Sequence, residues 1–516
     1  MKKQKGPCIM NESDTGGSAF LVTFINVPGH KTVTTTNLPP IGILSMSACL
    51  KKEGNRADFI DADACRYGID QLISLLRKRA PDLIGITMNV GHVYAAAKYI
   101  RAIKGEFPGI PIVIGGPYVS VTQKQILNEF PEADYAVAYE GEHAIVELVA
   151  VLKGTRKIET VRNLVYRKGC DIKINENERI VDIDALPLPD YGLIKHLLGK
   201  YRGVYPTIAR PSIGVMCSRG CPFHCGFCSS PSLWGSKVIF RNIDAVIDEI
   251  KMLRDTLAVK EVFFHDDTLN VRPGWFIELC DAIIKSGLNE QIYFKCALRV
   301  NKAMLSEELL IKAKQANFWM IFYGVENGNQ EMLNRMNKGT TIEEIERAFK
   351  LTRGCGICTY ALLIVGYPGE TKGTFADSLA LLEKIMPDFS GFAAAIPIPG
   401  TEMHRIALEQ GLISVTDFKN YQYGDIIMGT SELETRDIAA SVNKGYDEIS
   451  RLASSTKFKK MTEAFGQERF HRMVDGPFYC ERRQFKLRIK QMRRCLRAAP
   501  FLLAIKRKIG KRHELY

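Results

Sequence analysis

The sequence has no long hydrophobic run, and it lacks the cysteine density of a disulfide scaffold. Residues 1–18 are polar and contain no apolar segment long enough for a signal peptide or a membrane span. The 516 residues include 14 Cys, most of them far from one another, which is unlike a short and cysteine-dense disulfide scaffold. We therefore expect a cytoplasmic protein of two or three domains whose thiols are mostly free.

Outside its last residues the chain also has almost no net charge. The formal charge is +13, and residues 481–516 carry +11 of it because thirteen Lys or Arg face only two Glu there. Apolar residues are interleaved with these cations. The segment fits a solvated terminal helix, peripheral contact with an anionic membrane surface or, least favoured, nucleic acid. Its short apolar run "AAPFLLAI" cannot span a bilayer.

Two blocks of alternating strand and helix patterns make up most of the chain. From 19 to 152, five short apolar runs separated by amphipathic stretches predict a doubly wound, Rossmann-like parallel sheet, whose ligands bind at the carboxyl ends of its strands. From 212 to 400, six further units predict a partial (β/α)6, TIM-like barrel. The predicted divisions of this α/β protein are a Rossmann-like domain at 19–155, a linker with a hairpin at 156–205, the barrel at 206–400 and a helical C-terminal region at 401–516.

One group of potential metal ligands lies in the segment "CSRGCPFHCGFC", directly after the first predicted barrel strand. It contains Cys217, Cys221, His224, Cys225 and Cys228. A structural zinc site needs four closed ligands, usually in pairs from separate segments, and a thiol redox site favours a lone C-x-x-C. An iron–sulfur cluster needs only thiolates, and a C-x3-C-x2-C set of three leaves one iron open. We favour the cluster, because an open coordination position is what a catalytic metal centre keeps.

The spacing of Cys221, Cys225 and Cys228, with the aromatic Phe227 between the last two, resembles the signature of radical S-adenosylmethionine (SAM) enzymes. The resemblance implies that these cysteines hold a [4Fe-4S] cluster, that SAM chelates its open iron and that Phe227 lies at the cofactor. It further implies that an electron from an external donor of the flavodoxin or ferredoxin type cleaves SAM to a 5′-deoxyadenosyl radical. Such a radical removes hydrogen from an unactivated carbon, which no side-chain acid or base can do.

Further segments match this family in order along the barrel. Asp266 and Asp267 end the second strand, at the place where the family binds the SAM amino group. Arg299 ends the third strand and is predicted to bind the SAM carboxylate, and Glu326 after the fourth strand is a further predicted SAM contact, although Asn327 replaces the usual Ser. The alternatives are helix capping or solvation of the barrel end for the two aspartates, and a structural ion pair for Arg299 and Glu326.

The first block resembles the cobalamin-binding domain that precedes some radical SAM barrels. Gly115 and Gly116 after the fourth strand, and Gly141 after the fifth, would let a corrin nucleotide approach the backbone closely. A plain strand-to-loop turn is the alternative for the glycine pair. The D-x-H-x-x-G motif that supplies a lower cobalt ligand is absent, and His30 and His92 are disfavoured as substitutes. The resemblance allows cobalamin to bind without a protein histidine.

These patterns together predict a cobalamin-dependent radical SAM enzyme that methylates an unactivated carbon of a small-molecule or lipid substrate. One alternative uses the same cofactors for an oxidative cyclisation or a rearrangement without net methyl transfer. An alternative of another class is a membrane or nucleic-acid adaptor stabilised by a metal, which would bind zinc and would not cleave SAM.

Overall fold

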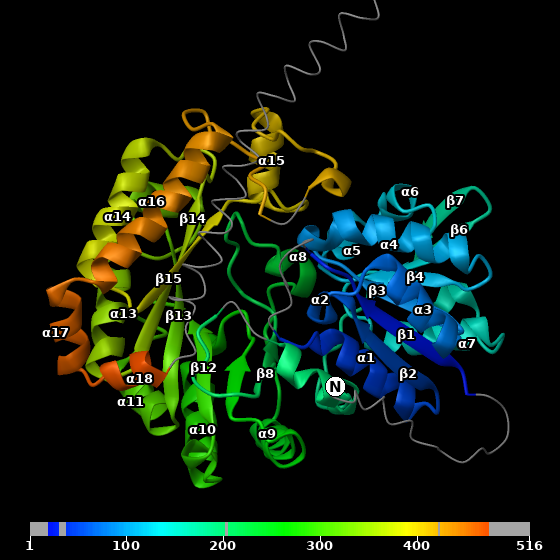
Figure 1. The fold of residues 1–516 in the computed structure, drawn as a ribbon, viewed down its shortest axis with the longest axis horizontal. Helices are drawn as coiled ribbons and strands as arrows, with labels where there is room; N and C mark the ends of the chain where they lie inside the picture. Colours follow the sequence, from blue (N-terminus) through cyan, green and yellow to red (C-terminus); the bar gives the residue numbers. More distant parts are fainter. Residues whose placement is uncertain (1–18, 30–37, 202–204, 422–423, 474–516) are drawn as a thin grey trace, which may run out of the picture.

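Two α/β units lie side by side in the computed structural model, which describes residues 19–29, 38–201, 205–421 and 424–473. The first unit is coloured blue to cyan in Figure 1, and the second green to yellow. No helix in these described ranges is long and apolar enough to cross a membrane. The basic segment 481–516, on which the membrane and nucleic-acid interpretations depend, lies outside them.

The first unit is built on a seven-stranded sheet in the order β2-β1-β3-β4-β5-β6-β7. The strands β1 to β5 pair in parallel, and β6 and β7 add an antiparallel hairpin at the edge. The strands are β1 (Leu21–Asn26), β2 (Arg56–Asp61), β3 (Leu83–Thr87), β4 (Ile112–Gly115), β5 (Tyr135–Val137), β6 (Leu164–Lys168) and β7 (Asp171–Ile174).

Helices cover both faces of this sheet, which explains why its parallel strands are continuous apolar runs. The helices are α1 (Ile41–Lys52), α2 (Ala62–Cys65), α3 (Ile69–Arg79), α4 (Val93–Glu106), α5 (Pro117–Thr122), α6 (Ile126–Glu129) and α7 (Glu142–Leu152). The predicted doubly wound sheet is thereby confirmed. The hairpin expected in the linker is present, and it extends this sheet because β6 pairs with β5.

The second unit is a barrel-like sheet of six parallel strands in the order β15-β14-β13-β12-β11-β8, as predicted. Its strands are β8 (Ser212–Val215), β11 (Glu261–Phe264), β12 (Tyr293–Leu298), β13 (Phe318–Glu326), β14 (Cys358–Val365) and β15 (Phe389–Ala394). The helices outside it are α9 (Ile243–Leu257), α10 (Pro273–Lys285), α11 (Glu307–Gln315), α12 (Gln330–Arg335), α13 (Ile342–Gly354) and α14 (Lys372–Ile385).

Each barrel strand buries both of its faces. On β13, Tyr323 packs outward in the core shared with the helices, whereas Phe322 packs inward with Phe263 and Tyr360. Tyr205, from the segment that precedes β8, contacts the rings of all three inward residues edge-on. The inward aromatic cluster therefore closes the lower part of the barrel.

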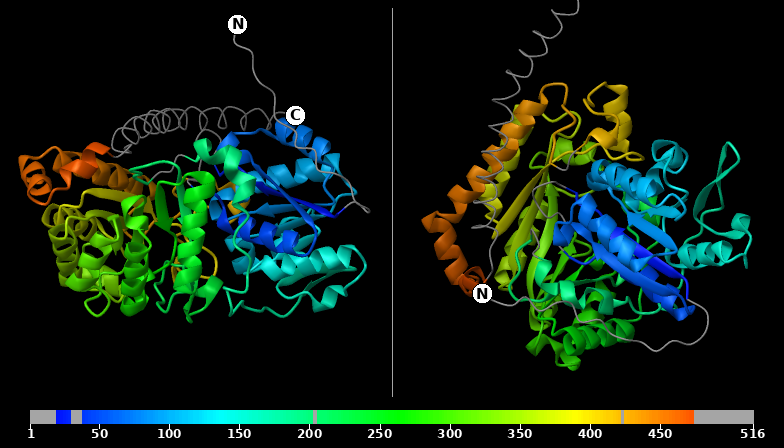
Figure 2. Two further views of the ribbon diagram at one scale, coloured as in Figure 1. Left: turned by 90° about the horizontal axis from the view of Figure 1, so that it is seen from below. Right: turned by 45° about the vertical axis from the view of Figure 1, so that its right-hand side comes forward.

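Four helices follow the barrel, as the helical C-terminal prediction requires: α15 (Glu402–Glu409), α16 (Thr435–Ala453), α17 (Thr456–Ala464) and α18 (Glu468–Met473). Helix α16 packs on β15 and α14, on the side of the barrel away from the first unit (Figures 1 and 2). Between β8 and α9 the chain forms the short pair β9 (Ser218–Arg219) and β10 (Ile239–Phe240), and the helix α8 (Ser230–Trp234).

Candidate functional site

The cysteine-rich loop follows β8 at the carboxyl end of the barrel. Cys221 and Cys225 are buried and Cys228 is half-buried. Each thiol contacts a different neighbour. The Cys221 Sγ lies 3.7 Å from the Thr268 Oγ1, the Arg299 Nη1 lies 3.7 Å from the Cys225 Sγ, and the backbone N–H of the residue at 230 donates to the Cys228 Sγ over 3.4 Å. Each of the three thiols is thus in contact with another residue of the barrel or of the loop.

The three thiols of the loop do not form a group whose sulfur atoms all lie within 4.8 Å of one another. Tetrahedral zinc with sulfur ligands brings neighbouring sulfur atoms to about 3.8 Å. Among the described residues, only Cys358, Asp388 and His471 bring three potential ligand atoms within 4.8 Å of one another. That group lies away from the loop, and there the His471 Nε2 is already paired with the Asp388 Oδ1 at 2.9 Å. The wider spacing in the loop suits an iron–sulfur cluster better than a single ion.

The other two potential ligands of this segment are used elsewhere. Cys217 is fully buried in the barrel core, and burial raises the pKa of its thiol well above the ordinary value. His224 is exposed, and its Nε2 lies 3.2 Å from the Ser236 Oγ. Neither side chain has the setting of a cluster ligand, in agreement with the C-x3-C-x2-C assignment.

Asp266 anchors the start of the loop. Its carboxylate accepts hydrogen bonds from the Cys217 backbone N–H at 3.1 Å and from the Ser218 hydroxyl at 2.5 Å, and burial raises its pKa to about 6. Asp267 is exposed and accepts from the Ser230 hydroxyl at 2.9 Å. Of the two aspartates, Asp267 is therefore the one with carboxylate surface open to a ligand.

Arg299 and Glu326 are brought to the same loop and are bound mainly to protein groups. The guanidinium of Arg299 lies 3.6 Å from the centre of the Phe223 ring, and its Nε donates to the Asn301 Oδ1 at 2.9 Å. Glu326 has a left-handed φ of 61° and forms a buried ion pair with the Lys338 Nζ at 2.6 Å. The sequence offered no sign of this lysine, because its role depends on a partner in the preceding strand.

Phe227 lies between the last two cysteines and packs against an apolar cluster next to the loop. Its neighbours there include Met332, Met336 and Tyr367. The Lys338 Nζ lies 5.6 Å from the centre of its ring. The two aromatic residues of the loop, Phe223 and Phe227, therefore each carry a cation on one face.

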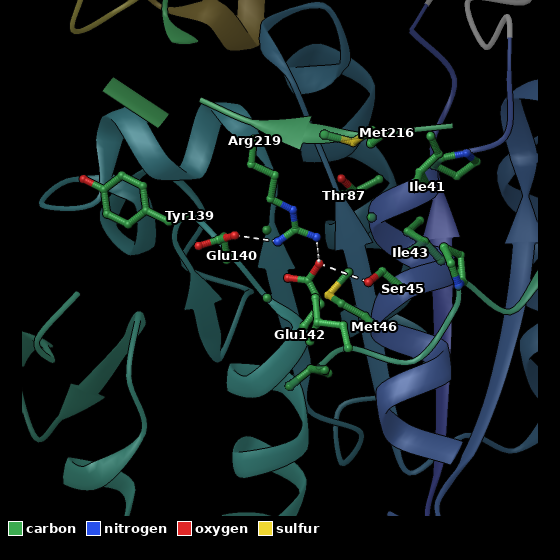
Figure 3. Close-up of a pocket in the computed structure, with 18 of the residues that line it drawn as sticks. Ile41, Ile43, Ser45, Met46, Thr87, Tyr139, Glu140, Glu142, Met216 and Arg219 are labelled. Carbon is green, nitrogen blue, oxygen red and sulfur yellow. Dashed lines mark hydrogen bonds and ion pairs between the residues drawn. The ribbon is translucent and has the colours of Figure 1, made fainter. Parts of the chain in front are cut away.

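A cavity of about 560 Å³ lies between the first domain and the segments of the second unit that flank the loop (Figure 3). Gly115, Gly116 and Gly141 line it at the carboxyl ends of β4 and β5, and Met216 and Arg219 line it from the barrel side. The three glycines predicted to meet a ligand thus border one space. Their lack of a side chain also suits the protein's own packing, since a Cβ on Gly116 would lie 2.6 Å from the Met88 carbonyl oxygen.

The chemistry of the cavity walls fits a corrinoid. Apolar side chains such as Phe24, Ile86 and Ile145 suit a flat heterocyclic tail, and Ser45 and Glu142 supply oxygen acceptors for the amide groups of a corrin rim. No histidine is among the described residues that line the cavity. His92 lies outside the lining, and His30 is outside the described residues.

Comparison with protein families decides between the alternatives. Residues 31–149 match the family model of the B12 binding domain, and residues 215–382 match the Radical SAM superfamily. The chain is a cobalamin-dependent radical SAM enzyme. Its cofactors are cobalamin, a [4Fe-4S] cluster and SAM. The metal-stabilised adaptor is excluded. The matched ranges contain the cavity-lining glycines and the cysteine loop.

Two relatives of this radical SAM enzyme align over most of its length. It is 28% identical over 418 residues to the uncharacterized methyltransferase PH0819 of Pyrococcus horikoshii, covering 81% of this chain and 88% of that protein. It is 29% identical over 413 residues to the anaerobic magnesium-protoporphyrin IX monomethyl ester cyclase of Cereibacter sphaeroides, covering 79% of this chain and 66% of the cyclase.

Solved structures share the fold of this radical SAM enzyme. The methyltransferase TsrM from Kitasatospora setae, with cobalamin and a [4Fe-4S] cluster bound, superposes with a TM-score of 0.63 at 19% identity, over 77% of this chain and 76% of TsrM. The cobalamin-dependent enzyme OxsB, with aqua-cobalamin and SAM bound, gives a TM-score of 0.68 at 18% identity, over 88% of this chain and 72% of OxsB.

Proposed function

We propose that this radical SAM enzyme transfers a methyl group from methylcobalamin to an unactivated carbon of a small-molecule or lipid substrate. The observation that carries the proposal is the shared cavity. Its walls come from both domains. Two of the residues that line it, Ser218 and Arg219, are separated from the proposed first cluster ligand, Cys221, only by Gly220. Cobalamin bound there would lie beside the cluster loop, as methyl transfer to a substrate radical requires.

The proposed division of labour follows from the contacts of the loop. SAM bound at the cluster supplies, on reductive cleavage, the radical that removes hydrogen from the substrate. Asp266 keeps the loop in place, and Asp267 has open carboxylate surface for the SAM amino group. The Arg299 guanidinium beside Cys225 leaves positive charge next to the thiolates and to an incoming carboxylate. We further propose that an external flavodoxin- or ferredoxin-type protein donates the electron.

The interior of the barrel offers a place for the reacting part of the substrate. Above the inward aromatic cluster, the strands carry small residues such as Gly214, Ala297 and Ala393. His265, after the end of β11, is exposed, and its ring centre lies 4.3 Å from that of Phe263 in the inward aromatic cluster. It borders Gly214 and, across that glycine, Ile41 of the first domain. We propose His265 as a polar contact for the substrate.

Cyclisation without net methyl transfer remains the second candidate, because the relatives include cyclases as well as methyltransferases. Cyclases of Cereibacter sphaeroides and Rubrivivax gelatinosus align over 79% and 80% of this chain. Relatives named as methyltransferases include PH0819 and the hopanoid C-3 methylase of Methylococcus capsulatus. A methyltransferase of this kind converts SAM to two products, S-adenosylhomocysteine and 5′-deoxyadenosine, whereas a cyclase forms only the second.

An anaerobic labelling experiment tests the proposal. The protein is reconstituted with iron, sulfide and methylcobalamin, and it is incubated with a reductant, SAM carrying a deuterated methyl group, and a metabolite and lipid extract of its own host. We expect S-adenosylhomocysteine, 5′-deoxyadenosine and a deuterium-labelled product to form together. Labelled SAM that yields 5′-deoxyadenosine and an unlabelled product would favour the cyclase. A Cys225→Ala variant, which lacks a cluster ligand, is the matched control for reactions of the extract itself.

A further inference from the structure

Arg219 joins the two domains of the enzyme through a buried ion-pair network. Its Nη1 pairs with the Glu140 Oε1 at 2.5 Å, and its Nη2 pairs with the Glu142 Oε1 at 2.6 Å. The side chains are 12%, 1% and 6% exposed, respectively, so water contributes little to their solvation. Figure 3 shows the guanidinium reaching from the short strand β9 to both glutamates at the edge of the cavity. We call Arg219, Glu140 and Glu142 the interdomain clamp.

Each residue of the clamp also forms a hydrogen bond with a group outside it. The Ser45 hydroxyl in α1 donates to the Glu142 Oε1 at 3.1 Å, and the backbone N–H of Ile180 donates to the Glu140 Oε2 at 2.6 Å. The Arg179 Nη2 donates to the backbone carbonyl oxygen at position 219 over 2.9 Å. The positions of both glutamates are therefore set by the first domain and by the linker, and the guanidinium must fit between them.

A short covalent path connects the clamp to the cluster. Only Gly220 separates Arg219 from Cys221. Gly220 has a φ of 109°, a conformation that other residues rarely adopt, and a Cβ there would collide with the Lys237 carbonyl oxygen. Because the conformation of this turn is restricted, a displacement of the Arg219 backbone would also displace Cys221, the proposed first cluster ligand.

The energetics favour a positional role over a purely stabilising one. Desolvating one guanidinium and two carboxylates is costly, and well-packed apolar residues often stabilise a fold as well as such a buried network does. An arginine held by two carboxylates does, however, fix both distance and angle, because its donors form a rigid plane. The guanidinium carbon also lies over the indole ring of Trp234, 5.6 Å from the ring centre.

We infer that Arg219 is a positioning residue that sets the cluster loop at a defined separation from cobalamin in the shared cavity. Both glutamates and the guanidinium line that cavity, so the same side chains that hold the loop also border the cobalamin. The inference goes beyond the proposed function, because it holds whether the enzyme methylates or cyclises its substrate.

Spin–spin coupling between cob(II)alamin and the reduced cluster tests this role without any substrate. The dipolar part of this coupling falls with the cube of the distance between the two centres, so electron paramagnetic resonance reports their separation directly. The key variant is Arg219→Met/Glu140→Gln/Glu142→Gln, which removes every charge of the clamp and so leaves no buried charge uncompensated. Arg219→Lys keeps the charge but loses the rigid fork.

We expect the neutral triple variant to fold and to keep its iron. Its spin–spin coupling should change from the single wild-type value to a broad distribution of values. It should also bind cobalamin about tenfold more weakly, as expected when one charge-assisted contact is lost. The coupling distribution and the cobalamin affinity of Arg219→Lys should lie between those of the wild type and of the triple variant. The control Lys295→Met/Glu261→Gln removes a buried pair between two barrel strands, 2% and 0% exposed, and should keep the wild-type coupling.

Two results would overturn the inference. One is a triple variant with the wild-type coupling, whatever its cobalamin affinity, which would reduce the clamp to a stabilising contact. The other is a triple variant that loses its iron although it stays folded, because the network would then support the loop itself and not its separation from cobalamin. If no labelled product forms with any extract, the proposed methyl transfer fails and the coupling measurement is unaffected.

Discussion

Replacing Gly116 with alanine tests why a glycine follows directly after β4. Gly116 has φ 103° and ψ −178°, a conformation that is essentially restricted to glycine and costs other residues about 1–3 kcal/mol. The new Cβ would also lie 2.6 Å from the Met88 carbonyl oxygen and 2.9 Å from the Thr87 Oγ1. The carbonyl is backbone and cannot rotate away, so overpacking adds about 1–3 kcal/mol. We expect Gly116→Ala to lower the free energy of unfolding by about 4 kcal/mol.

Two other glycines separate these contributions. Gly154 has a φ of 75° with open space around it, so Gly154→Ala should cost only about 1 kcal/mol. Gly105 is exposed near the end of α4, also in open space, so Gly105→Ala should be neutral or stabilise by about 0.5 kcal/mol. Urea unfolding of the apoprotein followed by far-ultraviolet circular dichroism gives the order. If Gly116→Ala and Gly154→Ala lowered the free energy of unfolding by the same amount, the predicted collision with the Met88 carbonyl would be refuted.

The remaining predictions concern the loop and two titrating groups. Cys217→Ala and His224→Ala should keep the wild-type iron and sulfide content, whereas Cys225→Ala should not; iron loss from either of the first two would contradict the assignment of ligands. Burial raises the pKa of Glu370 to about 7, so between about pH 4.5 and 7 the folded protein holds a proton that the unfolded chain has lost. Its stability should therefore fall by up to about 3 kcal/mol as the pH rises through this window, and Glu370→Gln should flatten that slope in urea unfolding. Burial and the charge of Lys295 lower the pKa of His265 to about 4, so nitrogen-15 NMR should find a neutral imidazole at pH 6; a cationic ring at that pH would show that the imidazole is solvated and not enclosed by the barrel.

Local patterns explain which parts of the structure the sequence could predict. The cluster motif spans 12 residues, and its ligand spacing is a property of one loop. The strands of both sheets are short apolar runs whose helices show regular amphipathic spacing, so the two α/β units follow from periodicity alone. The prediction that Cys217 is not a ligand also rests on local pattern, because Cys217 ends a predicted strand and the C-x3-C-x2-C set begins four residues later.

Contacts between distant segments could not be predicted in this way. Arg219 and Glu140 are 79 residues apart, and each belongs to a motif that is complete without the other. The hairpin at 164–174 offers its own strand pairing, so nothing local shows that β6 also pairs with β5. The glycines at 115 and 116 were interpreted through a ligand, whereas the positive φ of Gly116 and the nearby carbonyl are consequences of how β3 and β4 pack.

The same contrast applies to the electrostatics of the cluster loop. The motif contributes thiolates and two aromatic rings, and the cations that lie on those rings come from elsewhere: Arg299 from the end of β12, and Lys338 from the segment after α12. A cluster that gains negative charge on reduction is stabilised by such neighbours, because a positive charge in a poorly solvated site acts strongly. Both cations are also tied to other groups, Lys338 to Glu326 and Arg299 to Asn301. The loop contains the predicted ligands, and the rest of the barrel supplies the electrostatic surroundings of that loop.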